Sequence, residues 1–142
     1  MKNVLNFRKL MMSAYDCGRL QETLRCAKEE KNASPQILNA LEKEIGKAMV
    51  FPPDKIPPYL VTMHTTVRVI DNKAGGSLEF TLVYPGEEDV PSGKFSVLSD
   101  LGLAVLGFTV GDTVEWEFPD GIHSLRIDMI TYQPEATHNY EG

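Results

Sequence analysis

The spacing of apolar residues changes once along the chain and divides it into a helical part and a strand part. Up to residue 49, apolar residues recur every three or four positions, the period of a helix that buries one face. From residue 61 onward they alternate with polar residues, which is the period of a half-buried strand. The sequence therefore predicts an α+β protein whose helices come first.

The helical part predicts two helices, preceded at residues 9–12 by a short strand or an extended lead-in. The first helix covers residues 14–31. Its apolar stripe contains Leu20 and Leu24, and Asp16 is a possible N-cap. The stripe is narrow, as in the seam of a coiled coil.

The second helix, at residues 35–49, begins at Ser34-Pro35, an N-cap side chain followed by proline at the first helical position. Leu41 and Ile45 continue its stripe. The connection at residues 32–34 is short, so the two helices should be antiparallel neighbours. We expect a hairpin, a short coiled coil, only about 22–27 Å long at ~1.5 Å per residue.

A proline-rich segment separates the helical part from the strand part. Residues 51–60 contain four prolines, and proline has no backbone N–H to donate to a helix or a central strand. We therefore predict three parts: a helical hairpin at 1–50, a stiff linker at 51–60 and a sheet domain with an extended tail at 61–142.

The sheet domain is predicted to be antiparallel, with one short helix. Alternating apolar residues and intervening turns define the strands. The expected strands are residues 61–69, 78–82, 94–98, 113–118 and 125–129.

The short helix precedes the last two strands. Ser99 or Asp100 can cap it, Leu101 and Val105 have helical spacing, and Gly107 suits the left-handed conformation that ends a helix. A helix this short and apolar is not stable alone in water, so it should lie against the sheet.

Charge is distributed unevenly over the 142 residues, whose net charge is −6. Residues 1–50 hold nine Lys and Arg against six Asp and Glu, a balance of +3, and residues 51–142 hold five against fourteen, a balance of −9. An acidic surface repels nucleic-acid phosphates but suits a basic protein surface. We expect a protein partner and no sequence-specific nucleic-acid binding.

No targeting signal is visible in the sequence. No apolar run approaches the ~20 residues that cross a bilayer, and the N-terminus lacks a signal-peptide pattern. The expected location is the cytoplasm, without membrane contact.

Cysteines and histidines give no indication of a metal or cofactor. Cys17 and Cys26, on one helix, would lie about 13 Å apart, which is too far for a disulfide. His64, His123 and His138 lie in three separate predicted segments. We expect structural thiols, no metal site and no cofactor.

Adjacent carboxylates near the end of the first helix are the one candidate for cation chemistry. Glu29 and Glu30 could hold magnesium through their oxygens, but Lys28 and Lys31 flank them and would partly neutralise the site. Solvated charge at a helix end is the favoured interpretation. No phosphate-binding loop and no nucleophile elbow occurs in the sequence.

Several motifs over residues 13–136 resemble bacterial Gre-type transcript cleavage factors. They are Val61-Thr62-Met63, Thr81-Leu82-Val83-Tyr84-Pro85, Ser96-Val97-Leu98, Leu101-Gly102-Leu103-Ala104-Val105-Leu106-Gly107, Val110-Gly111-Asp112 and Val114-Glu115-Trp116. Three further motifs look like a branch of that family with a short hairpin. They are Pro52-Pro53 with Ile56-Pro57, Leu82-Val83-Tyr84-Pro85 and Tyr132-Gln133-Pro134-Glu135-Ala136.

The resemblance implies an FKBP-like C-terminal domain that docks on core RNA polymerase at the rim of its secondary channel, with the hairpin pointing into the channel. Some of Asp100, Leu103, Ala104 and Gly107 should face outward. The implied docking residues are Ser99, Asp100, Leu101, Leu103, Ala104 and Gly107, and the implied tip residues are Glu29, Glu30, Asn32 and Ser34.

Transcript cleavage is a separate question, because the family's hairpin tip holds a second magnesium ion within an Asp-Leu-x-Glu-Asn-type run. This chain has no such run, and its hairpin is short. We therefore expect a non-enzymatic regulator with no catalytic residue. The alternative is an enzyme, either a cleavage factor that uses Glu29 and Glu30 or a prolyl isomerase, as an FKBP-like domain would suggest.

Overall fold

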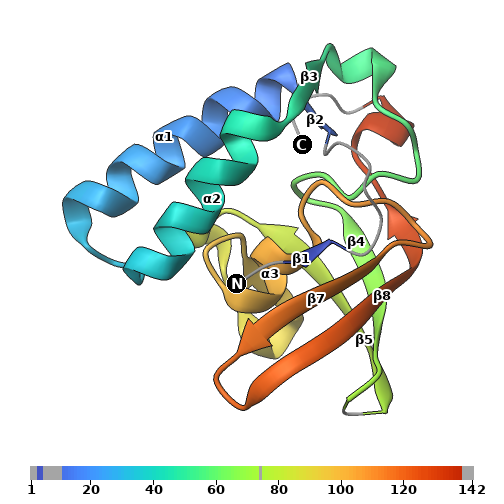
Figure 1. Cartoon of the computed structure of the whole chain (residues 1–142). Helices are drawn as coiled ribbons and strands as arrows, with labels where there is room; N and C mark the ends of the chain where they lie inside the picture. Colours follow the sequence, from blue (N-terminus) through green and yellow to red (C-terminus); the bar gives the residue numbers. More distant parts are fainter. Residues whose placement is uncertain (1–2, 5–10, 74, 139–142) are drawn as a thin grey trace.

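In the computed structural model, which describes residues 3–4, 11–73 and 75–138, a helical hairpin packs over a curled sheet (Figure 1). The helices are α1 (Ala14–Glu30), α2 (Pro35–Lys47) and α3 (Asp100–Val105). The strands are β1 (Asn3–Val4), β2 (Met11–Ser13), β3 (Met49–Phe51), β4 (Thr66–Asp71), β5 (Gly76–Val83), β6 (Lys94–Ser96), β7 (Thr113–Phe118) and β8 (Gly121–Tyr132). Four 3₁₀ turns are described, at Pro53–Lys55, Pro85–Glu87, Val90–Ser92 and Glu135–Thr137.

The predicted pair of helices is present, and side-chain caps define where both begin. Ser13 accepts a hydrogen bond from the backbone N–H of Asp16 at 3.0 Å. The N-cap of α1 is therefore Ser13, and the assignment of that role to Asp16 was wrong. Ser34 accepts from the N–H of Ile37 at 3.2 Å and caps α2, as the sequence predicts. Lys31, in the left-handed conformation at φ 54°, ends α1.

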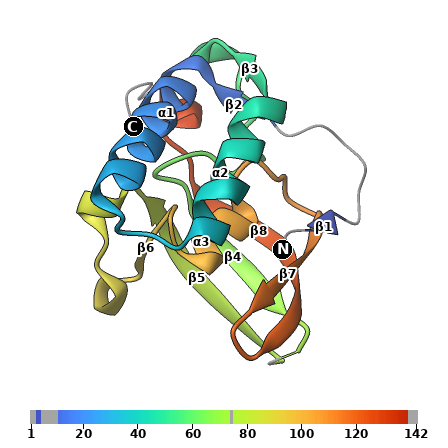
Figure 2. The same cartoon turned by 60° about the vertical axis from the view of Figure 1, so that its left-hand side comes forward.

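The hairpin shares its core with the rest of the molecule. α2 contacts α3 as well as α1, and Figure 2 shows α2 directly beside α3. Leu20 and Leu24 of α1 and Ile37 and Leu41 of α2 belong to the same buried cluster as the sheet residues. The apolar stripe of α2 thus covers α3 in addition to α1.

The main sheet has six strands in the order β1-β7-β8-β4-β5-β6. Four of its five pairings are antiparallel, but β5 and β6 run parallel, so the prediction of a wholly antiparallel sheet was wrong. Two 3₁₀ turns between β5 and β6 bring the chain back to the level of Thr81, so that β6 runs beside the end of β5 in the same direction. Register shifts between β4 and β8 accompany the curl of the sheet, since bulges bend and twist a strand pair.

The predicted strand at 61–69 forms only from Thr66 onward. Residues 62–65 make a turn in which the Thr65 N–H donates to the Thr62 carbonyl at 3.1 Å. His64 has a φ of 65°, which no strand residue adopts. Val61 and Met63 are both buried, so the alternating pattern correctly indicated buried side chains there, although the backbone does not form a strand.

The proline-rich segment is packed rather than free. Phe51 belongs to β3, which pairs in parallel with β2 at the base of the hairpin. Ile56 and Leu60 are buried, and the Gln133 amide donates to the carbonyls of Pro57 and Leu60 at 2.7 and 2.8 Å. The expected extended tail includes residues 139–142, which lie outside the described part, as do residues 9–10 of the lead-in.

Candidate functional site

Two segments carry the residues implied by the resemblance, α3 with its flanks and the tip of the hairpin. The Ser99 hydroxyl starts α3 by accepting from the Gly102 N–H at 3.1 Å, and it donates to the Ser96 carbonyl at 2.6 Å. A side chain at Gly102 would collide with that carbonyl and come within 3.0 Å of Leu82. The backbone of α3 at Gly102 therefore lies too close to β6 to leave room for a side chain.

The structure divides the proposed docking residues into two groups. Ser99, Asp100 and Leu101 are partly exposed. Leu103 and Ala104 are fully buried in the core, and Gly107 is buried as well. Of the four residues expected to include exposed ones, Asp100 is therefore partly exposed, and the expectation of a surface contact by Leu103, Ala104 or Gly107 was wrong. The physical reason is that α2 and the sheet both pack on this short helix and leave only its first turn accessible.

Asp100 is the most constrained polar group of this first turn. Its carboxylate accepts a hydrogen bond from the indole N–H of Trp116 in β7 at 2.7 Å. Trp116 is itself buried, with its ring in the core. A buried indole N–H needs an acceptor, so the pair fixes the carboxylate at the surface in one orientation.

At the hairpin tip, Glu29 and Glu30 have separate partners. Glu29 accepts from Arg25 at 2.9 Å, and Glu30 accepts from the Asn32 amide at 3.1 Å. Lys28 pairs with Glu42 of α2 at 3.2 Å, across the hairpin. The two carboxylates thus do not share a binding point, and both are solvent-exposed.

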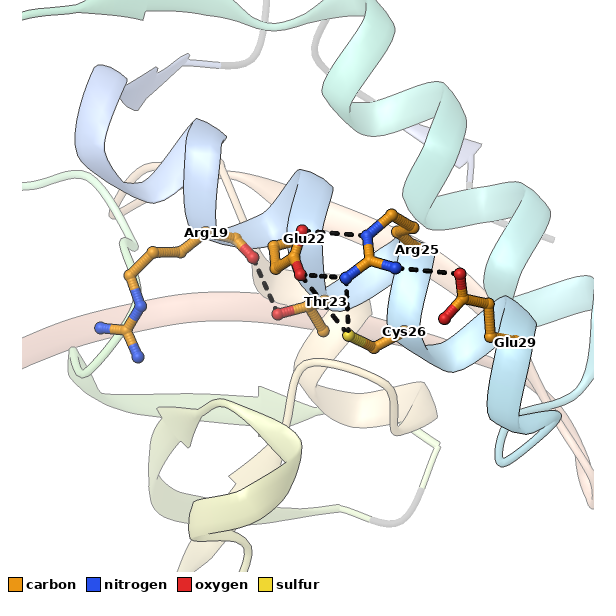
Figure 3. A network of polar contacts seen from close by, with 6 residues as sticks. All are labelled: Arg19, Glu22, Thr23, Arg25, Cys26 and Glu29. Carbon is orange, nitrogen blue, oxygen red and sulfur yellow. Dashed lines mark hydrogen bonds and ion pairs between the residues drawn. The ribbon is translucent and has the colours of Figure 1, made fainter.

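An arginine fork along α1, which the sequence interpretation missed, holds Glu29 (Figure 3). Arg25 donates to Glu22 through Nε at 3.1 Å and through Nη2, and it donates to Glu29 through Nη1 at 2.9 Å. The hydrogen bond from Arg25 holds the pKa of the Glu22 carboxyl below its usual value. The three- and four-residue spacings are the signal that would have identified these ion pairs.

A groove of about 340 Å³ lies between α1 and the segment that follows β5. Thr23, Cys26 and Tyr84 contribute to its walls. The guanidinium of Arg19 sits 4.0 Å from the centre of the Tyr84 ring, a cation–π contact. Arg19 points away from the fork of Arg25, as Figure 3 shows.

Among residues 3–4, 11–73 and 75–138, no three His, Cys, Asp or Glu side chains are grouped so as to hold a metal ion. Both cysteines are free. His123 lies between two carboxylates, with Nδ1 2.6 Å from Asp71 and Nε2 2.7 Å from Asp120, and these hydrogen bonds raise the pKa of its imidazole. Asp71 ends β4 and Asp120 lies in the turn between β7 and β8, which explains why the sequence did not reveal the cluster.

A prolyl isomerase needs an apolar pocket lined by aromatic side chains, and Phe80 and Phe108 are buried in the core. In the described part of the chain, no helix is long and apolar enough to cross a membrane.

These features match a known family. The family model "Transcription elongation factor, GreA/GreB, C-term" matches residues 57–132, which include β4 to β8 and α3. The chain therefore belongs to the GreA/GreB family of transcription elongation factors.

Individual relatives agree with this assignment. The regulator of nucleoside diphosphate kinase from Escherichia coli (strain K12) is 35% identical over 105 residues, which are 73% of this chain and 77% of the relative. Transcription elongation factor GreA from Christiangramia forsetii is 32% identical over 119 residues, covering 82% and 74% of the two chains. Relatives under both names therefore match most of this chain.

A solved structure shares the whole architecture. The prokaryotic transcription elongation factor GreA/GreB from Nitrosomonas europaea superposes with a TM-score of 0.71 at 38% identity. The alignment covers 87% of this chain and all of that one. The arrangement of hairpin and sheet domain described above is thus found in a second member of the family.

Proposed function

We propose that this protein is a regulator that binds core RNA polymerase at the rim of its secondary channel and does not itself cleave RNA. The sheet domain, which corresponds to the FKBP-like domain of the family, would dock, and the hairpin would enter the channel as a short coiled coil. Family membership supports the partner. The arrangement of charges at the hairpin tip supports the absence of cleavage.

Docking is assigned to the exposed first turn of α3. Ser99, Asp100 and Leu101 are its accessible members, and the hydrogen bond from Trp116 holds the carboxylate of Asp100 in place. A carboxylate fixed before binding loses little conformational freedom on binding. The buried Leu103, Ala104 and Gly107 support this turn from below and are not assigned a contact.

The partner surface should be basic. Residues 51–142 carry a formal charge of −9, and charge complementarity raises association rates. Binding of this kind weakens as salt increases. A polymerase-binding regulator would work in the cytoplasm, where the enzyme is found.

The observation that carries the proposal is the separation of Glu29 and Glu30. Holding a catalytic magnesium requires carboxylate oxygens that converge on one point. Here Arg25 engages one carboxylate and Asn32 engages the other. Occupying the channel, and so blocking longer factors from it, requires only the shape of the hairpin.

A stalled elongation complex tests this function. Mixed with the protein and magnesium, the complex should keep its transcript at full length, whereas addition of a cleaving factor should shorten it. Prior addition of this protein should slow that shortening by competition. Transcripts shortened by this protein, and spared by a Glu29→Ala, Glu30→Ala double variant, would overturn the proposal and make the tip a metal site.

A further inference from the structure

A buried turn at residues 62–65 joins the hairpin to the sheet domain. Thr62 and Thr65 are 1% and 0% exposed, and their hydroxyl oxygens lie 2.9 Å apart. The Thr62 N–H donates to the Thr65 hydroxyl at 3.0 Å. The last two residues of the turn are held to β5, because the His64 N–H donates to the Leu82 carbonyl and the Leu82 N–H donates to the Thr65 carbonyl.

From the hairpin side, Asp16 reaches this turn. Its carboxylate accepts a hydrogen bond from the Met63 N–H at 3.1 Å, although it belongs to the first turn of α1. The side chain is 5% exposed and Met63 is 1% exposed. This hydrogen bond ties the base of α1 to a turn 47 residues later in the chain.

From the other side, the C-terminal segment reaches the same turn. Glu135 is 7% exposed and accepts from the Thr62 hydroxyl at 2.8 Å. Two acidic side chains from distant parts of the chain thus hold adjacent residues of one turn. Burial, and then the charge of Glu135, raises the pKa of the Asp16 carboxyl to about 7.

Further charged and titratable groups surround this pair. Arg19, one helical turn after Asp16, lies over the Tyr84 ring and lowers the pKa of Asp16. His64 also packs against Tyr84, with ring centroids 5.5 Å apart, and its Nε2 lies 2.8 Å from Glu87. Polar groups therefore concentrate at the base of the hairpin, whereas α2 meets α3 through the apolar cluster.

The polar interface at the base of the hairpin and the apolar interface between α2 and α3 differ in how strictly they fix an orientation. Hydrophobic burial is non-directional, so an apolar contact between α2 and α3 tolerates a small rotation or slide. A hydrogen bond weakens steeply as its angle changes, so a buried carboxylate on a fixed turn allows one orientation. A small rotation at the base of a helix moves its far end much further.

We propose that Asp16 is a positioning residue that, through the turn at 62–65, sets the angle at which the hairpin leaves the sheet domain. The consequence for polymerase rests on the function proposed above, because that angle decides where Glu29, Glu30 and the rest of the tip lie in the channel. The angle itself is a property of the free protein.

Pulsed electron paramagnetic resonance on the full chain measures this angle. Spin labels would be placed at Gln36→Cys, near the tip, and Ser77→Cys, on β5, in a Cys17→Ser, Cys26→Ser background. Asp16→Ala, which leaves the Met63 N–H without its acceptor, should broaden the distance distribution or shift its maximum. Asp16→Asn keeps an oxygen acceptor and should retain the parent distribution.

Two further variants separate positioning from loss of stability. Asp112→Ala removes a fully buried carboxylate that accepts from the Thr109 N–H within the sheet domain, so it should lower the melting temperature without moving the labels. Thr62→Val removes the link to Glu135 without touching α1 and should move the labels as Asp16→Ala does. An unchanged distance distribution in Asp16→Ala would overturn the proposal, and it would indicate that the apolar contact between α2 and α3 sets the angle.

Polymerase binding is scored separately on the same variants. If the parent protein binds core polymerase, Asp16→Ala should bind with similar affinity but compete less well with longer channel-entering factors, and Asp16→Asn should compete as the parent does. If the parent does not bind polymerase, the proposed function fails, while the spectroscopic distances still decide the role of Asp16.

Discussion

At the scale of single residues, the fold depends on a few residues whose burial or close packing is not evident from the sequence. Asp16 occupies the first helical turn, where an acidic residue usually interacts with solvent and the helix dipole. Here it is buried and bonded to Met63. Gly102 looks like an ordinary small residue in an apolar run, yet its missing side chain permits the contact between α3 and β6.

The raised pKa of Asp16 predicts a pH-dependent stability. The carboxyl titrates at 3.8 in an unfolded chain and at about 7 here, so the native state binds more protons between these values. Stability from this group is therefore complete below pH ~4 and is lost as the pH rises through 7. Relative to Asp16→Asn, the parent should lose on the order of 3–5 kcal/mol of unfolding free energy between pH 4 and 8.

Urea unfolding followed by the fluorescence of Trp116, the one tryptophan of the chain, measures this difference. Parallel pH profiles for the parent and for Asp16→Asn would show that the buried carboxyl does not titrate in this range.

Gly102→Ala should destabilise the protein by about 2 kcal/mol or more, since the added methyl group meets the Ser96 carbonyl. Gly46→Ala is the matched control. It lies in α2 with nothing within 4 Å of the added atom, and it should stabilise by roughly 0.5–1 kcal/mol through helix propensity. Thermal melts of both variants test the prediction, and equal effects would mean that α3 can move away from β6.

At the scale of elements, α3 combines a buried core face with one accessible turn. Val105 and Leu103 lie on the buried face, and Asp100 lies on the accessible turn. A charged residue at Leu103 is therefore expected to unfold the domain, and it gives no information on docking. Variants in the first turn can separate binding from stability.

Asp100→Asn should weaken association with core polymerase by about three- to tenfold at low salt and make it less salt-dependent. The amide oxygen still accepts from Trp116, so the fold should be unchanged. Asp54→Asn, an equal change of charge on the exposed 3₁₀ turn at Pro53–Lys55, is the control and should have little effect. Equal effects of both variants would place the docking surface elsewhere.

At the scale of the whole molecule, the hairpin and the sheet domain share one core. Leu20 and Leu41 are fully buried in the cluster that also contains Leu103 and Trp116. The sheet domain nevertheless keeps most of its own apolar contacts, because buried residues of β4, β5, β7, β8 and α3 belong to one cluster.

A fragment of residues 51–142 is therefore expected to fold cooperatively but to melt at a temperature at least ~5 °C lower than the full chain. The lost contacts of Leu20 and Leu41 with the core account for the difference. Calorimetry of the fragment and of the full chain measures it. A fragment without a cooperative transition would show that the hairpin is needed to complete the core, and equal melting temperatures would show that the hairpin adds nothing to it.

The sequence by itself determined the elements whose signals are local. Caps at Ser34 and Ser99 and the 3.6-residue and two-residue periods located all three helices and most strands, since each depends on neighbours in the chain. Family motifs, also local, indicated the GreA/GreB relationship.

Only the tertiary structure decided what depends on residues far apart in the chain. Four features arise from packing between separate segments of the chain. They are the parallel pairing of β6, the turn that shortens the strand after Val61, the burial of Leu103 beneath α2, and the approach of Asp16 and Glu135 to one turn. An alternating or helical pattern states that one face is buried, but it does not state against what. For that reason the sequence indicated α3 as a candidate docking helix, and the structure alone showed which of its residues are accessible.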